Sequence, residues 1–290
     1  MLSLRSSNTS NATKFRKKKF SSVKEGPILW IDFTDSRTVY VDDSATKITP
    51  GQTIQVVDNK AFDKRFGKSS TLCIGSSLKQ GDASKRPSFQ AVGGQNGHTY
   101  ARFDGNNDTL DATKSVGNVA TNKLSDSRLD GQNMTVFWVA KNDSATPGRE
   151  TLLQIAGHDV SDATNDPITI GTGSDNYYIF MGDASDKSGD TDVLSGRQAT
   201  TNVEIWTFKF AGSSSAYMYA NGDTSDGVTN VTTKDHVYSL DANNEGCEIK
   251  LGSQSWNGDV YEVLIYPIAL PDKEIKEIER RLKQKYNLLV

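Results

Sequence analysis

Two carboxylates near the C-terminal end of the chain, Asp259 and Glu262, are the first candidates for catalysis. A retaining glycoside hydrolase needs a nucleophile and an acid on one face of a sheet, with carboxyl groups about 5–5.5 Å apart. Side chains alternate between the faces of a strand, so residues three apart in a regular strand point to opposite sides. We therefore expect Asp259 to cap a turn and Glu262 to be structural. An inverting glycosidase built from scattered acids is the weaker alternative.

The other residue types that commonly carry catalysis are dispersed. The three histidines, His98, His158 and His236, lie far apart in separate predicted loops. Such spacing indicates neither a nucleophile–histidine pair nor a zinc site. We expect no catalytic residues and no enzymatic activity.

Acidic loops offer a different chemistry, because carboxylate oxygens are the ligands that calcium prefers. Asp183, Asp186, Asp190 and Asp192 form the densest group. Their spacing is not that of an EF-hand, and solvated turn acids are the alternative to a structural calcium site. Asp104 and Asp108 follow a predicted strand, and we expect them to fix the turn through side-chain-to-backbone hydrogen bonds. We expect no other cofactor.

Sugar binding usually combines an exposed aromatic ring with a carboxylate or an amide. Trp256 next to Asn257, and the pair Tyr177 and Tyr178, are the candidates for a glycan-binding surface. Packing in the core or at its rim is the alternative for each of these aromatic residues. Trp138 and Trp206 stand in strongly apolar segments, so we assign both to the core.

The first 26 residues differ in composition from the rest of the chain. The stretch Lys14-Phe15-Arg16-Lys17-Lys18-Lys19-Phe20 carries five positive charges and two aromatic rings in a Ser/Asn-rich context. It is interpreted either as a solvated flexible tail or as an arm that docks on an acidic partner surface through Phe15 and Phe20. Contact with nucleic acid is the weakest of the three interpretations.

Composition narrows the class of protein. The formal net charge of −3 is atypical of a nucleic-acid-binding protein. The chain contains no apolar run of about 18 residues or more and no N-terminal apolar stretch typical of a secretion signal. The two cysteines, Cys73 and Cys247, are far apart, and we interpret them as reduced thiols, with a disulfide as the alternative.

Short alternating segments separated by turn residues predict an all-β domain over residues 27–290, preceded by an N-terminal arm over 1–26. The segment Met134–Ala140 is apolar on both faces, which indicates a central strand. Only the C-terminal end has a helical period, with apolar residues at Ile275, Ile278, Leu282 and Tyr286. This stripe predicts one short surface helix packed along one face.

Several short sequence boxes occur in an order that resembles the laminin-G-like branch of the concanavalin A-like lectin/glucanase superfamily. The boxes are Trp30-Ile31-Asp32, Asp35–Val39, Asp58-Asn59-Lys60, Arg86-Pro87, Phe103–Leu110, Thr135–Val139, Tyr219–Gly222, Ile249–Gly252 and Gly258–Val263. The resemblance implies a concanavalin A-like jelly-roll β-sandwich with one C-terminal helix. A tryptophan that often precedes the Asp-Lys pair is replaced here by Val56-Val57. The Glu-x-Asp-x-x-Glu strand of the superfamily's glucanases is absent from this chain.

Three functions are carried forward. The first is a non-enzymatic virion protein of a tailed phage, a capsid decoration, fibre or tail component. Its arm would bind other virion proteins within an oligomeric assembly, and its sandwich would bind host-surface glycans. The virion location leans on the resemblance, on the basic arm and on the lack of a secretion signal. The second is a bacterial carbohydrate-binding lectin or adhesion module, and the third is a glycoside hydrolase.

Overall fold

The computed structural model describes a two-sheet protein in ten segments. These are residues 26–61, 77–112, 133–148, 150–157, 168–173, 176–181, 191–211, 216–222, 247–252 and 256–288. The predicted arm, including Lys14 to Phe20, lies outside these segments.

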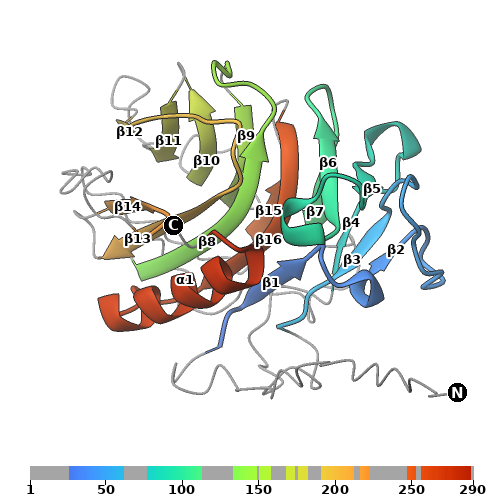
Figure 1. The fold of residues 1–290 in the computed structure, drawn as a ribbon, viewed down its shortest axis with the longest axis horizontal. Helices are drawn as coiled ribbons and strands as arrows, with labels where there is room; N and C mark the ends of the chain where they lie inside the picture. Colours follow the sequence, from blue (N-terminus) through green and yellow to red (C-terminus); the bar gives the residue numbers. More distant parts are fainter. Residues whose placement is uncertain are drawn as a thin grey trace, which may run out of the picture.

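The first sheet has seven strands and is antiparallel (Figure 1). Its order is β14 (Ala216–Ala220), β13 (Glu204–Ala211), β8 (Asn133–Asn142), β16 (Asn257–Tyr266), β6 (Tyr100–Asp104) and β5 (Ser88–Gln90), with β1 (Leu29–Asp32) also paired to β16. Strands β6 and β1 share one edge of β16: β6 pairs with its first residues, and β1 pairs with its last. The apolar strand β8 pairs with β13 and β16 and is therefore central, as predicted.

The second sheet has nine short strands. Its order is β12 (Thr191–Gln198), β11 (Asn176–Met181), β10 (Ile168–Gly173), β9 (Glu150–Gly157), β15 (Cys247–Leu251), β7 (Leu110–Ala112), β4 (Ser77–Lys79), β3 (Val56–Asp58) and β2 (Val39–Tyr40). Three single turns of 3₁₀ helix join strands: η1 (Ser36–Thr38), η2 (Ala83–Lys85) and η3 (Gln95–Gly97).

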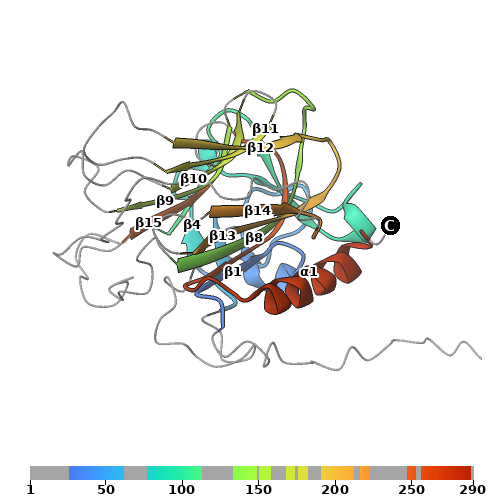
Figure 2. The same cartoon turned by 90° about the vertical axis from the view of Figure 1, so that its left-hand side faces the viewer.

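The two sheets stack on a common apolar core, which makes the fold a β-sandwich (Figure 2). Trp138 and Trp206 are each 1% exposed and belong to this core, as predicted. Burial of such large side chains is the main favourable term in folding. The all-β class and the sandwich architecture predicted from the sequence are confirmed.

The C-terminal helix α1 (Asp272–Tyr286) lies on the outer face of the first sheet, away from the second (Figure 2). Its buried residues include all four members of the predicted stripe, which pack in a second apolar cluster against β8, β13 and β16. Acidic residues occupy the first turn and basic residues the last, which complements the helix dipole. Asn287, in the left-handed conformation with φ 52°, ends the helix.

Candidate functional site

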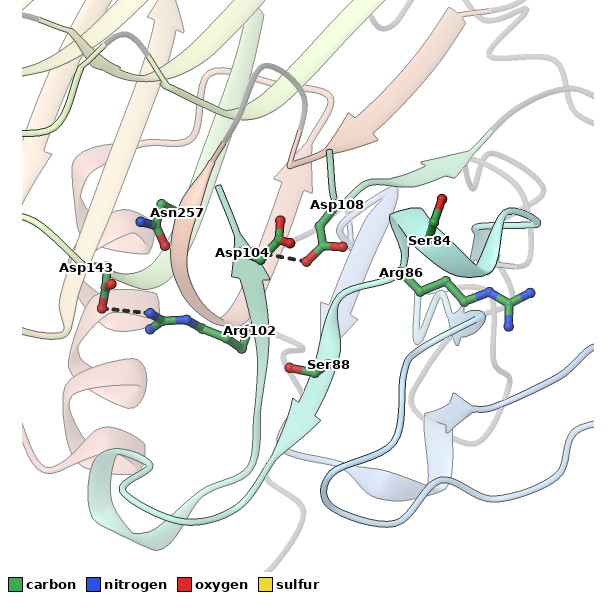
Figure 3. Close-up of a pocket in the computed structure, with 8 residues that line it drawn as sticks. All are labelled: Ser84, Arg86, Ser88, Arg102, Asp104, Asp108, Asp143 and Asn257. Atoms are coloured by element: carbon green, nitrogen blue, oxygen red, sulfur yellow. Dashed lines mark hydrogen bonds and ion pairs between the residues drawn. The ribbon is translucent and has the colours of Figure 1, made fainter. Parts of the chain in front are cut away.

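A polar pocket of about 460 Å³ lies where β6 ends and β16 begins (Figure 3). Its lining residues come from the η2–β5 segment, β6 and the turn after it, the end of β8, and the start of β16. They are Ser84, Arg86, Ser88, Arg102, Asp104, Asp108, Asp143 and Asn257. Ligand pockets in proteins have volumes of about 300–1,000 Å³, so this one has room for a small polar ligand.

The turn after β6 positions the acidic side of the pocket. Asp104 Oδ1 accepts a hydrogen bond from the amide of Asn106 at 2.9 Å, and Asp108 Oδ2 accepts one from the amide of Asp104 at 3.0 Å. The predicted turn-fixing role of both carboxylates is therefore confirmed. Gly105 has φ +80°, and a Cβ atom there would come within 2.8 Å of the Cβ of Asn257. Only glycine lets Asn257 lie this close to the turn.

The two guanidinium groups of the pocket are already bound by protein groups. Arg102 donates to Asp143 Oδ1 at 2.7 Å and to Asp259 Oδ1 at 2.9 Å. Arg86 donates to two backbone carbonyl oxygens of the Gln80–Gly81 segment, each at 2.9 Å. Figure 3 shows the Arg86 guanidinium pointing away from Arg102 and the acidic turn. Each arginine therefore uses two of its five N–H donors on protein groups and directs them away from the acidic turn.

Hydrogen-bond acceptors remain open to the pocket. Asp108 is only 8% exposed, yet its Oδ1 makes no hydrogen bond within the described part of the chain. Burial raises the pKa of Asp108 to about 6, and the negative charge of Asp104 adds to this rise. Burial also acts on Asp104, but hydrogen bonds from Asn106 outweigh it and lower the pKa of Asp104. The amide group of Asn257 lines the same space.

The strand argument that separated Asp259 from Glu262 is wrong, because β16 is not regular there. Val260 pairs with Ala140 and Glu262 pairs with Val139, so Tyr261 is the extra residue of a β-bulge. Val260 and Val263 face the core between the sheets, whereas Tyr261 packs in the outer cluster. The bulge thus puts Asp259 and Glu262 on the same, outer face of the sheet.

Each of these two carboxylates is nevertheless held by its own protein partners. Asp259 is 4% exposed and bound by Arg102, while Glu262 is 2% exposed. Glu262 accepts hydrogen bonds from Trp30 Nε1 at 2.7 Å, Lys285 Nζ at 2.7 Å and Tyr286 Oη at 2.8 Å. Glu262 is therefore structural, as predicted. The reason is its set of protein partners, and not its separation from Asp259 onto opposite faces of the strand.

Glu262 belongs to a buried ionic network that joins α1 to the sheet. Asp32 accepts from Lys60 Nζ at 2.8 Å and from Lys285 Nζ at 3.1 Å. Burial disfavours the charged form of Asp32, but Lys285 and Lys60 outweigh it, so its pKa is lowered. Next to Lys60, Asn59 holds the start of β1: its side chain accepts a hydrogen bond from the amide of Trp30 and donates one to the carbonyl oxygen of Ile28. Apart from Lys285 and Tyr286 of α1, these residues come from the Trp30–Asp32, Asp58–Lys60 and Gly258–Val263 boxes.

Trp256 is not the exposed sugar platform that its neighbour Asn257 suggested. It is 1% exposed and packs in the core between the sheets, with its ring close to Gly258. The alternative, core packing, is what the structure shows. Asn257, in contrast, lines the pocket.

The side chains of the other predicted site residues are not described by the structure. Tyr177 and Tyr178 are in β11 and Asp192 is in β12, but their side chains lie outside the described part of the structure, as do Asp183, Asp186 and Asp190 entirely. Among the described residues, no group of three or more metal-ligating side chains comes together. Calcium binding and arm docking remain predictions. Of the histidines, His98 is described, with Nε2 3.0 Å from the carbonyl oxygen of Lys285 at the end of α1.

Comparisons with known proteins agree on the general architecture alone. No family model matches the chain, and no curated protein matches it. Among solved structures, the binding domain of botulinum neurotoxin serotype G is 11% identical over 89% of this chain and 51% of that one, with a TM-score of 0.48. Domain 4 of AbnA, an arabinanase of Geobacillus stearothermophilus solved with arabinotriose, is 14% identical over 88% of this chain and 100% of that one, with a TM-score of 0.45.

A third neighbour is the CBM40 domain of the Ruminococcus gnavus IT-sialidase, 11% identical over 54% of this chain and 90% of that one, with a TM-score of 0.42. The chain spans about half the length of the neurotoxin binding domains that it resembles. At these identities and scores the likeness carries no argument about activity, and the laminin-G-like resemblance stays a prediction. Within the described segments, no helix is long and apolar enough to cross a membrane.

Proposed function

We propose that this protein is a non-enzymatic carbohydrate-binding module whose pocket at the junction of β6 and β16 holds a saccharide through its hydroxyl groups. The observation that carries the proposal is the carboxyl of Asp108, which lines an open polar pocket and whose Oδ1 accepts no hydrogen bond from the described residues. Water reaches this oxygen in the free protein, and a hydroxyl of a ligand can replace that water as the donor.

Saccharides suit this chemistry because each ring presents several hydroxyl groups in a fixed arrangement. The carboxylates of Asp104, Asp108 and Asp143 can only accept hydrogen bonds when ionised, whereas the amide of Asn257 can both donate and accept. The lining residues include no aromatic ring, so hydrogen bonds rather than ring stacking would supply the affinity. Domain 4 of AbnA, described above, was solved with arabinotriose, and the proposal for this chain does not depend on that likeness.

The binding test is titration calorimetry against the saccharides selected by a broad glycan array. We expect Asp108→Asn and Asn257→Ala to weaken binding by about 10- to 100-fold, the range for loss of a hydrogen bond to a charged or well-placed polar group. Asp272→Asn is the matched control, because it removes an exposed carboxylate on α1 that is outside the pocket. Absence of binding to any saccharide, or equal binding by all four proteins, would reject the proposal.

One observation favours a second candidate, a glycoside hydrolase. The pKa of Asp108 is raised to about 6 while that of Asp104 is lowered, and a pair of carboxyls with separated pKa values is the pattern of an acid and a base. Against it, both carboxylates hold the turn through hydrogen bonds. Release of reducing sugar from a bound saccharide, lost in Asp108→Asn, would establish the hydrolase and replace the binding module.

A further inference from the structure

We propose that the acidic side of this pocket, formed by Asp104 and Asp108, is a subsite for the protonated amine of an amino sugar, and that the pocket discriminates against acidic sugars. This inference rests on the proposed carbohydrate-binding function and names its ligand class. It follows from which charges in the pocket are already neutralised and which are not.

The positive charges of the pocket are either balanced by carboxylates or directed away from the acidic turn. The guanidinium of Arg102 lies between two carboxylates, Asp143 at 2.7 Å and Asp259 at 2.9 Å, and Lys141 Nζ lies 3.9 Å from Asp259, so the charges of these four groups balance when all are ionised. The guanidinium of Arg86 binds backbone carbonyl oxygens and points away from the acidic turn (Figure 3). A sugar carboxylate at the acidic turn would therefore meet the carboxylates of Asp104 and Asp108 without a facing cation among the described residues.

The carboxylates of the turn have no counter-ion within the part of the chain that the structure describes. Within the described segments, neither Asp104 nor Asp108 forms an ion pair, and the groups that lower the pKa of Asp104 are hydrogen-bond donors, not cations. Asp108 also lines the pocket as a residue that is only 8% exposed, and its Oδ1 accepts no hydrogen bond from the described residues. A buried carboxylate in this condition gains most from a cation that can also donate a hydrogen bond.

An ammonium group on a sugar ring meets both requirements. It carries three donors on a compact centre, enough to bind Asp108 Oδ1 and Asp104 at the same time. The neighbouring ring hydroxyls then reach the amide of Asn257 and the hydroxyl of Ser88, which line the same pocket. A neutral hydroxyl in place of the amine makes hydrogen bonds without charge assistance, which are about half as strong.

The test uses the full-length chain and an array in which each sugar backbone is present with a hydroxyl, a free amine, an acetamido group or a carboxylate at the varied position. We expect the free-amine form of the bound backbone to bind about tenfold more tightly than the hydroxyl form. The acidic form should bind most weakly. In Asp108→Asn the preference for the amine should shrink to about threefold or less, while Asp272→Asn should retain it.

Two further readouts identify the interaction as ionic. Raising the salt concentration should reduce the amine preference, since ions screen charges that water can reach. Lowering the pH through about 6 should also reduce the preference for the amine, because Asp108 becomes protonated. The other charged groups that line the pocket are Asp104, Asp143, Arg86 and Arg102. Equal binding of amine and hydroxyl forms, or tighter binding of the acidic form, would overturn this inference and leave the binding function intact. Failure of every sugar to bind would overturn both.

Discussion

Replacing Asp108 by asparagine should make the protein more stable at neutral pH, although we expect the same change to weaken ligand binding. The substitution conserves shape, and the new amide oxygen can still accept the hydrogen bond from the backbone of Asp104. It removes only the negative charge that burial and Asp104 disfavour. Sites shaped for binding commonly have such a cost to the free protein.

The size of the effect follows from the pKa of the carboxyl. Burial raises it from 3.8 to about 6, and at about 1.4 kcal/mol for each pKa unit the ceiling is about 3 kcal/mol. The Asp108 carboxyl faces an open pocket, so water and salt reduce this value, and we expect a gain of about 1 kcal/mol.

The pH dependence has a definite sign. Between pH 3.8 and about 6 the folded protein keeps a proton on Asp108 that the unfolded chain has lost, so this residue's contribution to stability falls as the pH rises. The advantage of Asp108→Asn should therefore be near zero below pH 3.8, grow across this window and stay constant above pH 6. Acid effects of other groups are common to both proteins and cancel in the difference.

Urea denaturation of the two proteins, at pH values roughly half a unit apart between about 3.5 and 8, measures this difference in stability directly. Asp272→Asn, which removes a carboxylate whose side chain is 73% exposed, should show no gain at any pH. If Asp108→Asn is less stable than the unaltered protein at pH 7.5, the Asp108 carboxylate is a stabilising turn residue and the reasoning about an unsatisfied charge fails.

Three further changes test the framework around the pocket. Lys60→Met should lower the free energy of unfolding by about 3 kcal/mol, because Asp32 loses its nearest buried cation; a loss under about 1 kcal/mol in urea would contradict the network. Gly252→Ala should cost about 2–4 kcal/mol, since φ is +78° and the new Cβ would clash with the backbone of Asp108 and the ring of Phe103; thermal melting measures it, and an unchanged midpoint would contradict the packing. Trp256→Ala should cost about 3–5 kcal/mol as a core truncation. Saccharide affinity measured on the folded fraction of Trp256→Ala should stay near normal, and a selective loss of affinity in a stable variant would restore Trp256 as a ligand contact.

The sequence boxes predicted the fold well because many of their polar residues hold elements together. Asn59 and Lys60 bind β1, and Glu262 binds Trp30 and the end of α1, so three distant boxes meet in one buried network. Such residues are conspicuous in a sequence because polar types interrupt apolar strands. The apolar stripe predicted the C-terminal helix equally well, since its residues recur with the period of an α-helix and lie on the one face that packs on the sheet.

The pocket was harder to predict, because it depends on which polar groups remain unbound after folding. The prediction that Asp104 and Asp108 fix the turn is confirmed, yet nothing in their types shows that one oxygen of Asp108 is left without a partner among the described residues. Arg102 has the residue type expected for binding an anion, but its cross-strand partner Asp259 and the nearby Asp143 occupy its donors. Long-range pairings of this kind are set by strand register, which a single sequence specifies only through its pattern of apolar residues.

The pattern of apolar residues does not predict which way the side chains of β16 point. From Val260 to Tyr266, every residue of β16 except Glu262 is apolar or aromatic, because one face packs in the sandwich core and the other under α1. A strand buried on both faces lacks the alternation from which parity is inferred. In a regular strand with Val260 in the core, Glu262 would also point into the core. The bulge at Tyr261 turns Glu262 outward, where Lys285 and Tyr286 donate hydrogen bonds to its carboxylate. A buried charge needs such partners, and this need explains a β-bulge that the alternation of a regular strand does not predict.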